Sequence, residues 1–284
     1  MEVKEILHPV SVEEAIEFLG KTESSKLLAG GTDLILEISR EKLNVEYLVS
    51  LQRISSLKHI KEEANKIVIG SMLTFNELKA SKIVSKNFLS LIHCAETMGS
   101  PQIRNMATIG GNIVNAASAA DVIPCLMSLD ATLNIKGGSG SRSISIVEYF
   151  EKYSENKLLP DEIIECISIE KGDGIGGFYK LGKRNSLAIA RVSAALWIKV
   201  ENNIVKEGRL ALGAVGRYPF RLYDYEKSIT GCDIEYLQSI EVLDIIENAV
   251  QESIKGRKTM PFKKEAVKGV YKQALNRTLK HMNI

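Results

Sequence analysis

Two pairs of adjacent glycines most constrain what this chain can fold into. Gly30-Gly31 follows the apolar residues 27–29, and Gly110-Gly111 lies within Thr108-Ile109-Gly110-Gly111-Asn112. Consecutive residues without a Cβ can turn sharply, present their N–H groups to one concave surface and let a diphosphate approach. The first pair also fits a tight turn between two strands, and the second fits a buried loop whose amides satisfy one another.

The second pair lies in a long segment without charge. No charged residue occurs between Arg104 and Asp121. Such a segment can lie against a flat ligand with polar edges, because its N–H groups can reach phosphate or carbonyl oxygens while a carboxylate accepts from a ribose or a ring N–H. Each glycine pair is flanked by a threonine and by an aspartate or asparagine, which favours a ligand with several phosphates or rings.

A third glycine cluster resembles a dinucleotide motif only superficially. Residues 172–177 match GxGxxG, but a dinucleotide fold needs a helix that opens inside the motif. The bulky residues 178–181 follow instead and favour a strand, so we interpret this cluster as a linker between domains. The cations Lys180, Lys183 and Arg184 after it fit either a solvated turn or a positive group facing the electron-rich edge of a flavin.

Length and charge narrow the class of protein. A chain of 284 residues favours two domains, and a net charge of +2 gives no overall attraction to nucleic acid or membranes. The charge is uneven, because residues 255–284 hold nine basic residues and one acidic residue. This basic segment fits a docking surface or a solvated helix equally well. Apolar runs fall short of the ~18 residues that span a bilayer, and the acidic start does not fit a secretory signal, so we expect a cytoplasmic protein.

The reactive residue types are scattered. The four cysteines are far apart in sequence and form no CxxC pair, and the four histidines form no HExxH motif. We therefore expect the chain to hold no metal of its own. GxSxG, P-loop and deaminase signatures are also missing from the sequence, so no residue is predicted to be catalytic in hydrolysis or phosphoryl transfer.

Local patterns predict an α+β protein with a boundary at residues 170–177. Capping boxes at Ser11 to Glu14 and Thr74 to Glu77 predict helix starts, and 88–98 has helical spacing. Asn202-Asn203 predicts a hairpin between strands 192–200 and 204–215. The remaining predictions are strands at 26–29, 67–70, 131–136, 141–146 and 163–169, and helices at 236–254 and 262–282.

Several of these segments together resemble the FAD-binding subunit of the molybdenum hydroxylases, the family of the xanthine, nicotinate and carbon monoxide dehydrogenase medium subunits. The resemblance rests on Leu27-Leu28-Ala29-Gly30-Gly31-Thr32-Asp33-Leu34, Gln102-Ile103-Arg104-Asn105, Thr108-Ile109-Gly110-Gly111-Asn112 and Asp121. It implies a two-subdomain FAD-binding fold of the vanillyl-alcohol-oxidase (PCMH) type, followed by a smaller C-terminal α+β domain. The expected boundaries are residues 1–170, with subdomains of about 1–57 and 58–170, and residues 177–284.

The resemblance also implies a set of cofactor-binding residues. The FAD diphosphate would lie on Lys26, Leu27, Leu28, Ala29, Gly30, Gly31, Thr32, Asp33 and Leu34. The flavin and diphosphate would be lined by Thr108, Ile109, Gly110, Gly111 and Asn112, with Ser100 just upstream. Asp121 would bind a polar group of the cofactor, Ile164 would pack on the isoalloxazine, and Lys180 would approach its polar edge. Met98 lies where some relatives place an aromatic residue on the ring.

The function that the resemblance implies is electron transfer. A molybdopterin centre in a large subunit would oxidise the substrate, and [2Fe–2S] clusters in a small subunit would pass electrons to FAD in this chain, which would reduce NAD⁺ or another acceptor. Two alternatives stay open from the residues: a stand-alone flavin-dependent oxidoreductase of the same fold, and a nucleotide-binding interaction module. The first usually needs a base near the ring, and neither glycine segment has a histidine beside it.

Overall fold

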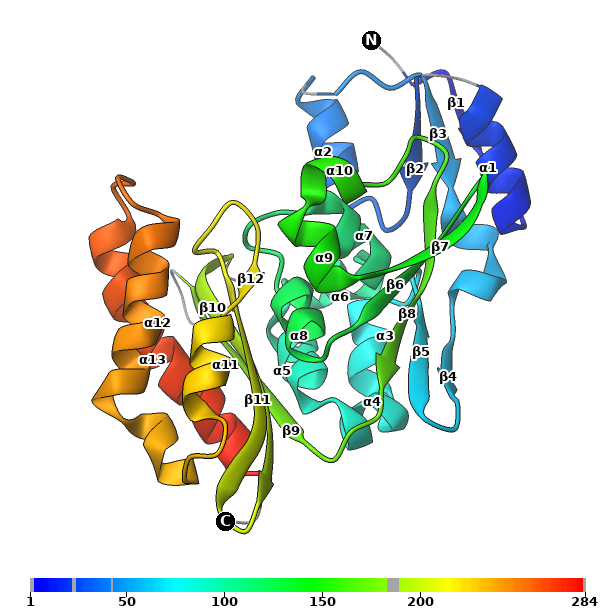
Figure 1. Cartoon of the computed structure of the whole chain (residues 1–284). Helices are drawn as coiled ribbons and strands as arrows, with labels where there is room; N and C mark the ends of the chain where they lie inside the picture. The colour runs from blue at the N-terminus through cyan, green and yellow to red at the C-terminus, as the bar shows by residue number, and fades with distance from the viewer. Residues whose placement is uncertain (1–2, 22–23, 42, 183–188, 283–284) are drawn as a thin grey trace. The chain divides into compact units, whose positions relative to one another are not determined.

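The computed structural model describes residues 3–21, 24–41, 43–182 and 189–282 (Figure 1). They form two compact units, each assembled from separate stretches of chain. Unit 1 comprises Met1–Glu77, Ser100–Asn115 and Ala131–Glu170, and unit 2 comprises Leu78–Gly99, Ala116–Asp130 and Lys171–Ile284. The predicted domain boundary at residues 170–177 would divide the chain at one point, whereas each unit combines three separate stretches. The boundary stays a prediction.

Unit 1 contains two sheets. The first is parallel, with the order β1 (Glu5–Leu7), β3 (Tyr47–Ser50), β2 (Ser25–Leu28). Helix α1 (Val12–Lys21) runs beside it and buries its apolar face (Figure 1). The second sheet is antiparallel, with the order β4 (Ile60–Glu62), β5 (Lys66–Gly70), β8 (Ile163–Glu170), β6 (Thr132–Gly137), β7 (Gly140–Ser145).

Short helices complete unit 1 and the segments that leave it. They are α2 (Leu34–Ser39), η1 (Leu51–Arg53), η2 (Ser55–Leu57), α3 (Phe75–Ala80), α6 (Pro101–Met106), α7 (Ile109–Asn115), α9 (Ile146–Glu151) and α10 (Tyr153–Asn156). The predicted capping box at α3 is confirmed in both directions: Glu77 N–H donates to Thr74 Oγ1 at 3.3 Å, and Thr74 N–H donates to Glu77 Oε2 at 2.8 Å. At α1, Glu14 N–H donates to Ser11 Oγ, but the Glu14 carboxylate accepts from Val10 N–H.

Unit 2 is a four-stranded antiparallel sheet covered on both faces. Its order is β12 (Phe220–Arg221), β11 (Ile204–Gly213), β10 (Ala190–Glu201), β9 (Ile175–Gly182). One face is covered by α11 (Tyr223–Ile229) and α13 (Met260–Leu279), and α12 (Ile240–Ser253) packs on both of these helices (Figure 1). The other face is covered by α5 (Leu89–Thr97) and α8 (Val122–Ser128), and α4 (Lys82–Asn87) precedes α5. Because both faces are covered, residues 192–198 of β10 are all buried.

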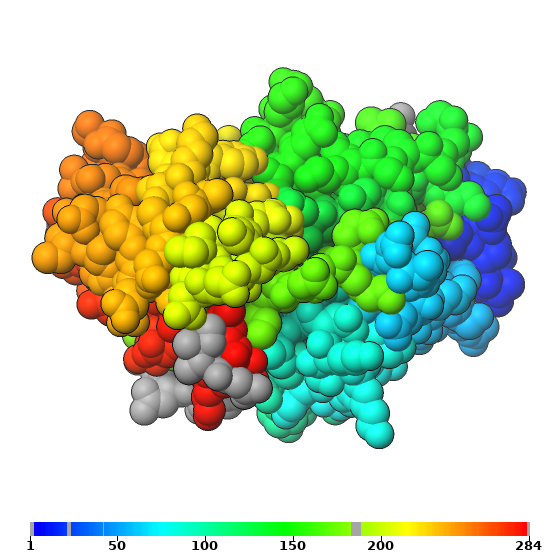
Figure 2. All heavy atoms as spheres, turned by 60° about the horizontal axis from the view of Figure 1, so that its bottom comes forward, coloured from blue at the N-terminus to red at the C-terminus, as the bar shows by residue number. Residues whose placement is uncertain are grey.

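The chain of unit 2 confirms the predicted hairpin and changes one predicted helix. Asn202 and Asn203 have φ of 52° and 63°, the left-handed region that asparagine tolerates, and they connect β10 to β11. In the space-filling view, this hairpin and α12 lie at the surface of unit 2 (Figure 2). The predicted helix 236–254 is instead the short η3 (Ile234–Gln238) followed by α12, because Ser239 breaks the helix and accepts the N–H of Val242.

The third glycine cluster runs into a strand, as its bulky neighbours predict. β9 begins at Ile175, inside the motif, and no helix opens there among the residues that the structure describes. A Cβ on Gly174 would lie 2.2 Å from Trp197 Cζ2. The glycines therefore allow close packing on Trp197, which explains the motif without a nucleotide.

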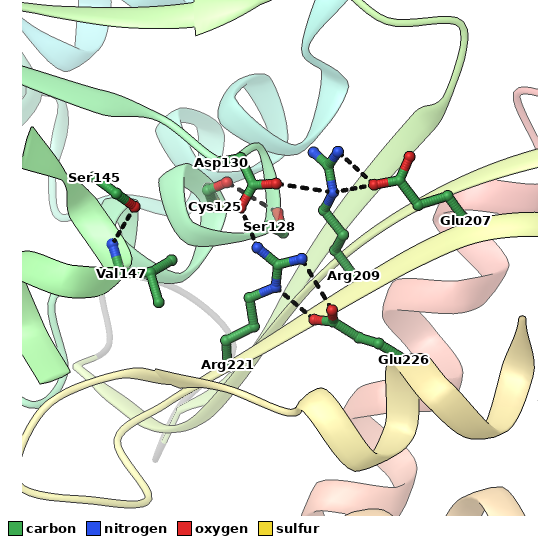
Figure 3. A network of polar contacts seen from close by, with 9 residues as sticks. All are labelled: Cys125, Ser128, Asp130, Ser145, Val147, Glu207, Arg209, Arg221 and Glu226. Atoms are coloured by element: carbon green, nitrogen blue, oxygen red, sulfur yellow. Dashed lines mark hydrogen bonds and ion pairs between the residues drawn. The ribbon is translucent and has the colours of Figure 1, made fainter.

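An ion-pair network joins the end of α8 to the sheet of unit 2 (Figure 3). Asp130 lies between Arg209 and Arg221 and pairs with both. Arg221 also pairs with Glu226, and only 10% of its side chain is exposed. Figure 3 also shows Glu207 on the far side of Arg209, so each guanidinium has two carboxylate partners. This arrangement compensates the cost of burying Arg221.

Candidate functional site

A cavity of about 890 Å³ lies within unit 1 and is lined by both predicted glycine segments. This volume is in the range of pockets that bind small molecules and cofactors. The predicted site residues that line it are Lys26, Leu27, Ala29, Gly30, Gly31, Thr32, Asp33, Leu34, Thr108, Gly110, Gly111, Asn112 and Ile164. The structure thus brings segments that are about eighty residues apart in sequence to one concave surface.

The two glycine segments are in direct contact. A Cβ on Gly111 would lie 3.6 Å from the Cβ of Ala29, and Asn115 Nδ2 donates to Asp33 Oδ2 at 3.1 Å. Neither segment is a simple turn between strands. The first connects β2 to α2, and the second opens helix α7 at Ile109.

Two of the glycines are required by their surroundings. A Cβ on Gly30 would lie 1.8 Å from the carbonyl oxygen of Met106, at the end of α6. Gly31 has a φ of 71°, a conformation that is strained for other residues. The absence of a Cβ at Gly30 therefore sets how closely the first segment approaches the end of α6, just before the second segment begins.

The first segment offers a row of unused hydrogen-bond donors. Within the described part of the chain, the backbone N–H groups of residues 30–34 have no acceptor. An unpaired N–H is costly unless water or a ligand accepts from it. Consecutive N–H groups on a glycine loop are the donor set that binds phosphate oxygens, so this segment fits the diphosphate of a dinucleotide.

Two buried polar atoms at the same cavity also have no partner among the described residues. They are Oδ1 of Asn112, which accepts hydrogen bonds, and Oγ of Ser71, which can donate or accept. Both residues line the cavity. A ligand with both donor and acceptor edges, such as a flavin with its ribityl chain, fits this pair of atoms.

Most of the carboxylates that line the cavity already have a donor. Asp33 accepts from Asn115, Asp161 accepts from Gly138 N–H at 2.9 Å, and Glu162 is paired with Arg142, which lies outside the cavity lining. These contacts reduce the repulsion that a bound diphosphate would meet.

Two predicted site residues belong to unit 2 and form a buried ion pair there. Lys180 Nζ donates to Asp121 Oδ2, and only 8% and 4% of the two side chains are exposed. Burial raises the pKa of the Asp121 carboxyl, and Lys180 opposes that rise. Asp121 Oδ1 is buried and has no partner among the described residues, so it retains the capacity to accept a hydrogen bond.

The other predicted residues lie outside the cavity lining. Ser100 caps α6 by accepting the N–H of Ile103 at 3.2 Å, Ile109 is buried in the core, and Leu28 packs beside Gly31. Met98 follows α5 in unit 2. Lys183 and Arg184 lie outside the described residues.

Sequence reasoning missed one wall of the cavity. Residues 157–163 line it together with Ser71, Met72, Ala107 and Asn115. The Leu159-Pro160-Asp161 stretch indicates a turn before a strand. Nothing local in the sequence indicates that this turn lies against the glycine segments.

Comparison with known proteins identifies the family. Residues 2–170 match the family described as the FAD binding domain in molybdopterin dehydrogenase, and residues 177–278 match the CO dehydrogenase flavoprotein C-terminal domain. The chain belongs to the FAD-binding subunits of the molybdenum hydroxylases. The expected family is confirmed, and so is the α+β fold, with an FAD-binding domain followed by a C-terminal domain of the CO dehydrogenase flavoprotein type.

Relatives of this FAD-binding subunit cover most of its length. The nicotinate dehydrogenase FAD-subunit of Eubacterium barkeri is 30% identical, with 95% of this chain and 94% of the relative covered. The glyceraldehyde dehydrogenase medium chain of Sulfolobus acidocaldarius is 32% identical over 78% of this chain and 79% of its own length. A chain in a solved structure of carbon monoxide dehydrogenase from Hydrogenophaga pseudoflava has a TM-score of 0.90 at 26% identity, with 98% of both chains covered.

The FAD-binding subunit therefore belongs to an oxidoreductase. Its described residues contain no helix long and apolar enough to cross a membrane. They also contain no group of three or more histidine, cysteine, aspartate or glutamate side chains that could hold a metal ion.

Proposed function

We propose that this chain carries FAD in the cavity of unit 1 and transfers electrons from the [2Fe–2S] clusters of a small partner subunit to NAD⁺ or another acceptor. Substrate oxidation would take place at a molybdopterin centre in a large partner subunit. The observation that carries the proposal is the contact between the two glycine segments on one cavity with unused N–H donors. The relatives belong to multi-subunit dehydrogenases, and this supports the proposal that the chain has partner subunits.

Each part of the cavity has a distinct task in this proposal. The N–H groups of residues 30–34 and the hydroxyl of Thr32 bind the diphosphate and fix its position. Asn112 Oδ1 and Ser71 Oγ bind polar edges of the cofactor, and Ile164 packs against its ring. FAD, when bound, supplies the ability to accept electrons singly and donate them as a pair.

The buried pair in unit 2 has an electrostatic task. The resemblance would place Lys180 near the polar edge of the isoalloxazine, where its positive charge would stabilise the negative charge that reduction adds. Asp121 holds Lys180 in place through Oδ2, and its Oδ1 has no partner among the described residues. Because the pair is shielded from water, its electrostatic effect exceeds that of a surface pair.

The direct test is FAD binding by the purified full chain. We expect a flavin absorption band near ~450 nm, either as purified or after addition of FAD. Gly111→Leu should abolish binding with the fold retained, because Gly111 lines the cavity and the leucine side chain would occupy the space of the cofactor. Gly269→Leu is the matched control, since a Cβ there has no atom within 4 Å.

Three results would contradict the proposal. Equal FAD occupancy of the Gly111 and Gly269 variants would refute the assigned cavity. A chain that never binds FAD would refute the cofactor. A homo-oligomer of this chain that oxidises a substrate without partner subunits would favour a stand-alone flavin-dependent oxidoreductase.

A further inference from the structure

The wall of the cavity that the sequence did not reveal is held by one arginine. Residues 157–162 connect α10 to β8 and line the cavity. They form no helix or strand of their own. A loop of this kind keeps one conformation only if other groups fix it. The candidate for this role is the pair between Arg142 on β7 and Glu162, the last residue of the loop before β8.

The contacts of the pair are those of a two-point clamp. Arg142 Nε donates to Glu162 Oε1 at 2.7 Å, and its Nη2 donates to Glu162 Oε2 at 2.8 Å. Bidentate pairs of this geometry are among the stronger side-chain interactions and fix orientation as well as distance. The side chain of Glu162 is only 6% exposed, so water competes little for its oxygens.

The clamp extends to both ends of the loop. Arg142 Nη2 also donates to the carbonyl oxygen of Asn156 at 3.2 Å, and Glu162 Oε2 accepts Leu159 N–H at 2.8 Å. The start, the middle and the end of the loop are therefore tied to one guanidinium. Because β6 lies between β7 and β8, Arg142 reaches across a strand to make these contacts.

The clamp also changes the electrostatics of the cavity. Glu162 lines the cavity and would repel a diphosphate if its charge were unpaired. Arg142 does not line the cavity, yet its guanidinium compensates the charge of Glu162 through their ion pair. Removal of the guanidinium would therefore free the loop and expose the ligand to an uncompensated carboxylate.

We propose that Arg142 is a positioning residue for the cofactor site, which acts through Glu162 to hold residues 157–162 against the bound FAD. This inference rests on the proposed function, since it assumes that FAD is the ligand of the cavity. It assigns to β7 a role that neither glycine segment predicts.

The test compares FAD affinity in two arginine variants of the full chain. Arg142→Met should raise the Kd for FAD at least about tenfold, measured by flavin fluorescence well below the unfolding temperature. Arg142→Lys keeps the charge but can hold only one carboxylate oxygen, so its Kd should lie between those of the wild type and the methionine variant. If the methionine variant does not fold, the lysine variant decides by the same comparison.

The matched control is Arg221→Met in unit 2, which removes a guanidinium with a similar bidentate glutamate partner that lines no part of the cavity. It should lower the unfolding temperature and leave the Kd for FAD unchanged. The positioning role would be overturned if the Arg142 variants bound FAD with the Kd of the wild type. It would also be overturned if the Kd for FAD rose equally in the Arg221 variant. A wild-type chain that binds no FAD would instead overturn the proposed function, and the inference with it.

Discussion

Gly30→Ala is the substitution that most directly tests how the two glycine segments form the site. The added Cβ would lie 1.8 Å from the carbonyl oxygen of Met106 and 2.6 Å from its carbonyl carbon. Both contacts are with backbone atoms at the end of α6, so no side-chain rotation relieves them.

The size of the effect follows from the displacement. Cβ atoms essentially never lie closer than 3.0 Å to such an atom, so the first glycine segment and the end of α6 must separate by more than about 1 Å. Overpacking of this kind costs about 1–3 kcal/mol of unfolding free energy, and sometimes more. The N–H groups of residues 30–34 move with the segment, and the loss of one bond to a charged phosphate raises the Kd for FAD about tenfold or more.

Urea denaturation and fluorescence titration with FAD measure the two effects. Gly111→Ala should cost less stability than Gly30→Ala, because the added Cβ meets the Thr108 hydroxyl, which can rotate away. Gly269→Ala, in the exposed middle of α13, should instead stabilise the protein by about 0.5–1 kcal/mol without a change in FAD affinity. A Gly30→Ala variant with wild-type stability and wild-type affinity would refute this account of the site.

Three further predictions concern unit 2. Lys180→Met should destabilise the protein by about 3–5 kcal/mol, because it leaves the buried Asp121 unpaired. The double variant with Asp121→Asn should recover part of this loss in urea denaturation at neutral pH, and additive losses of the two substitutions would contradict the prediction. Burial, with the nearby charge of Arg277, lowers the pKa of His93 to about 4. The unfolded chain therefore binds a proton first as pH falls, so stability should decrease from about pH 6.5 toward 4, and His93→Gln should flatten this dependence. An unchanged profile in thermal unfolding would argue against a half-buried neutral imidazole at this position. Asn203→Ala should cost about 1 kcal/mol in the same assay because of its φ of 63°, and Asn203→Gly should not.

The sequence predicted the features that depend on neighbouring residues. The capping box of Thr74 and Glu77, the hairpin at Asn202 and Asn203, and the strand at the third glycine cluster follow from local hydrogen bonding and backbone preference. The long helix expected from residue 236 was divided at Ser239, because a serine that caps a helix also ends the segment before it. The family was also accessible from the sequence, since its glycine motifs are short and specific.

The tertiary structure alone decided which residues share the cavity. Nothing within the turn at residues 157–162 indicates that it lies against the glycine segments, and nothing around Arg142 indicates that it holds this turn. These relations depend on the strand order β8-β6-β7, which brings distant segments together. Side-chain patterns record the local preference of each segment, whereas the pairing of strands far apart in sequence is set by burial of the whole core.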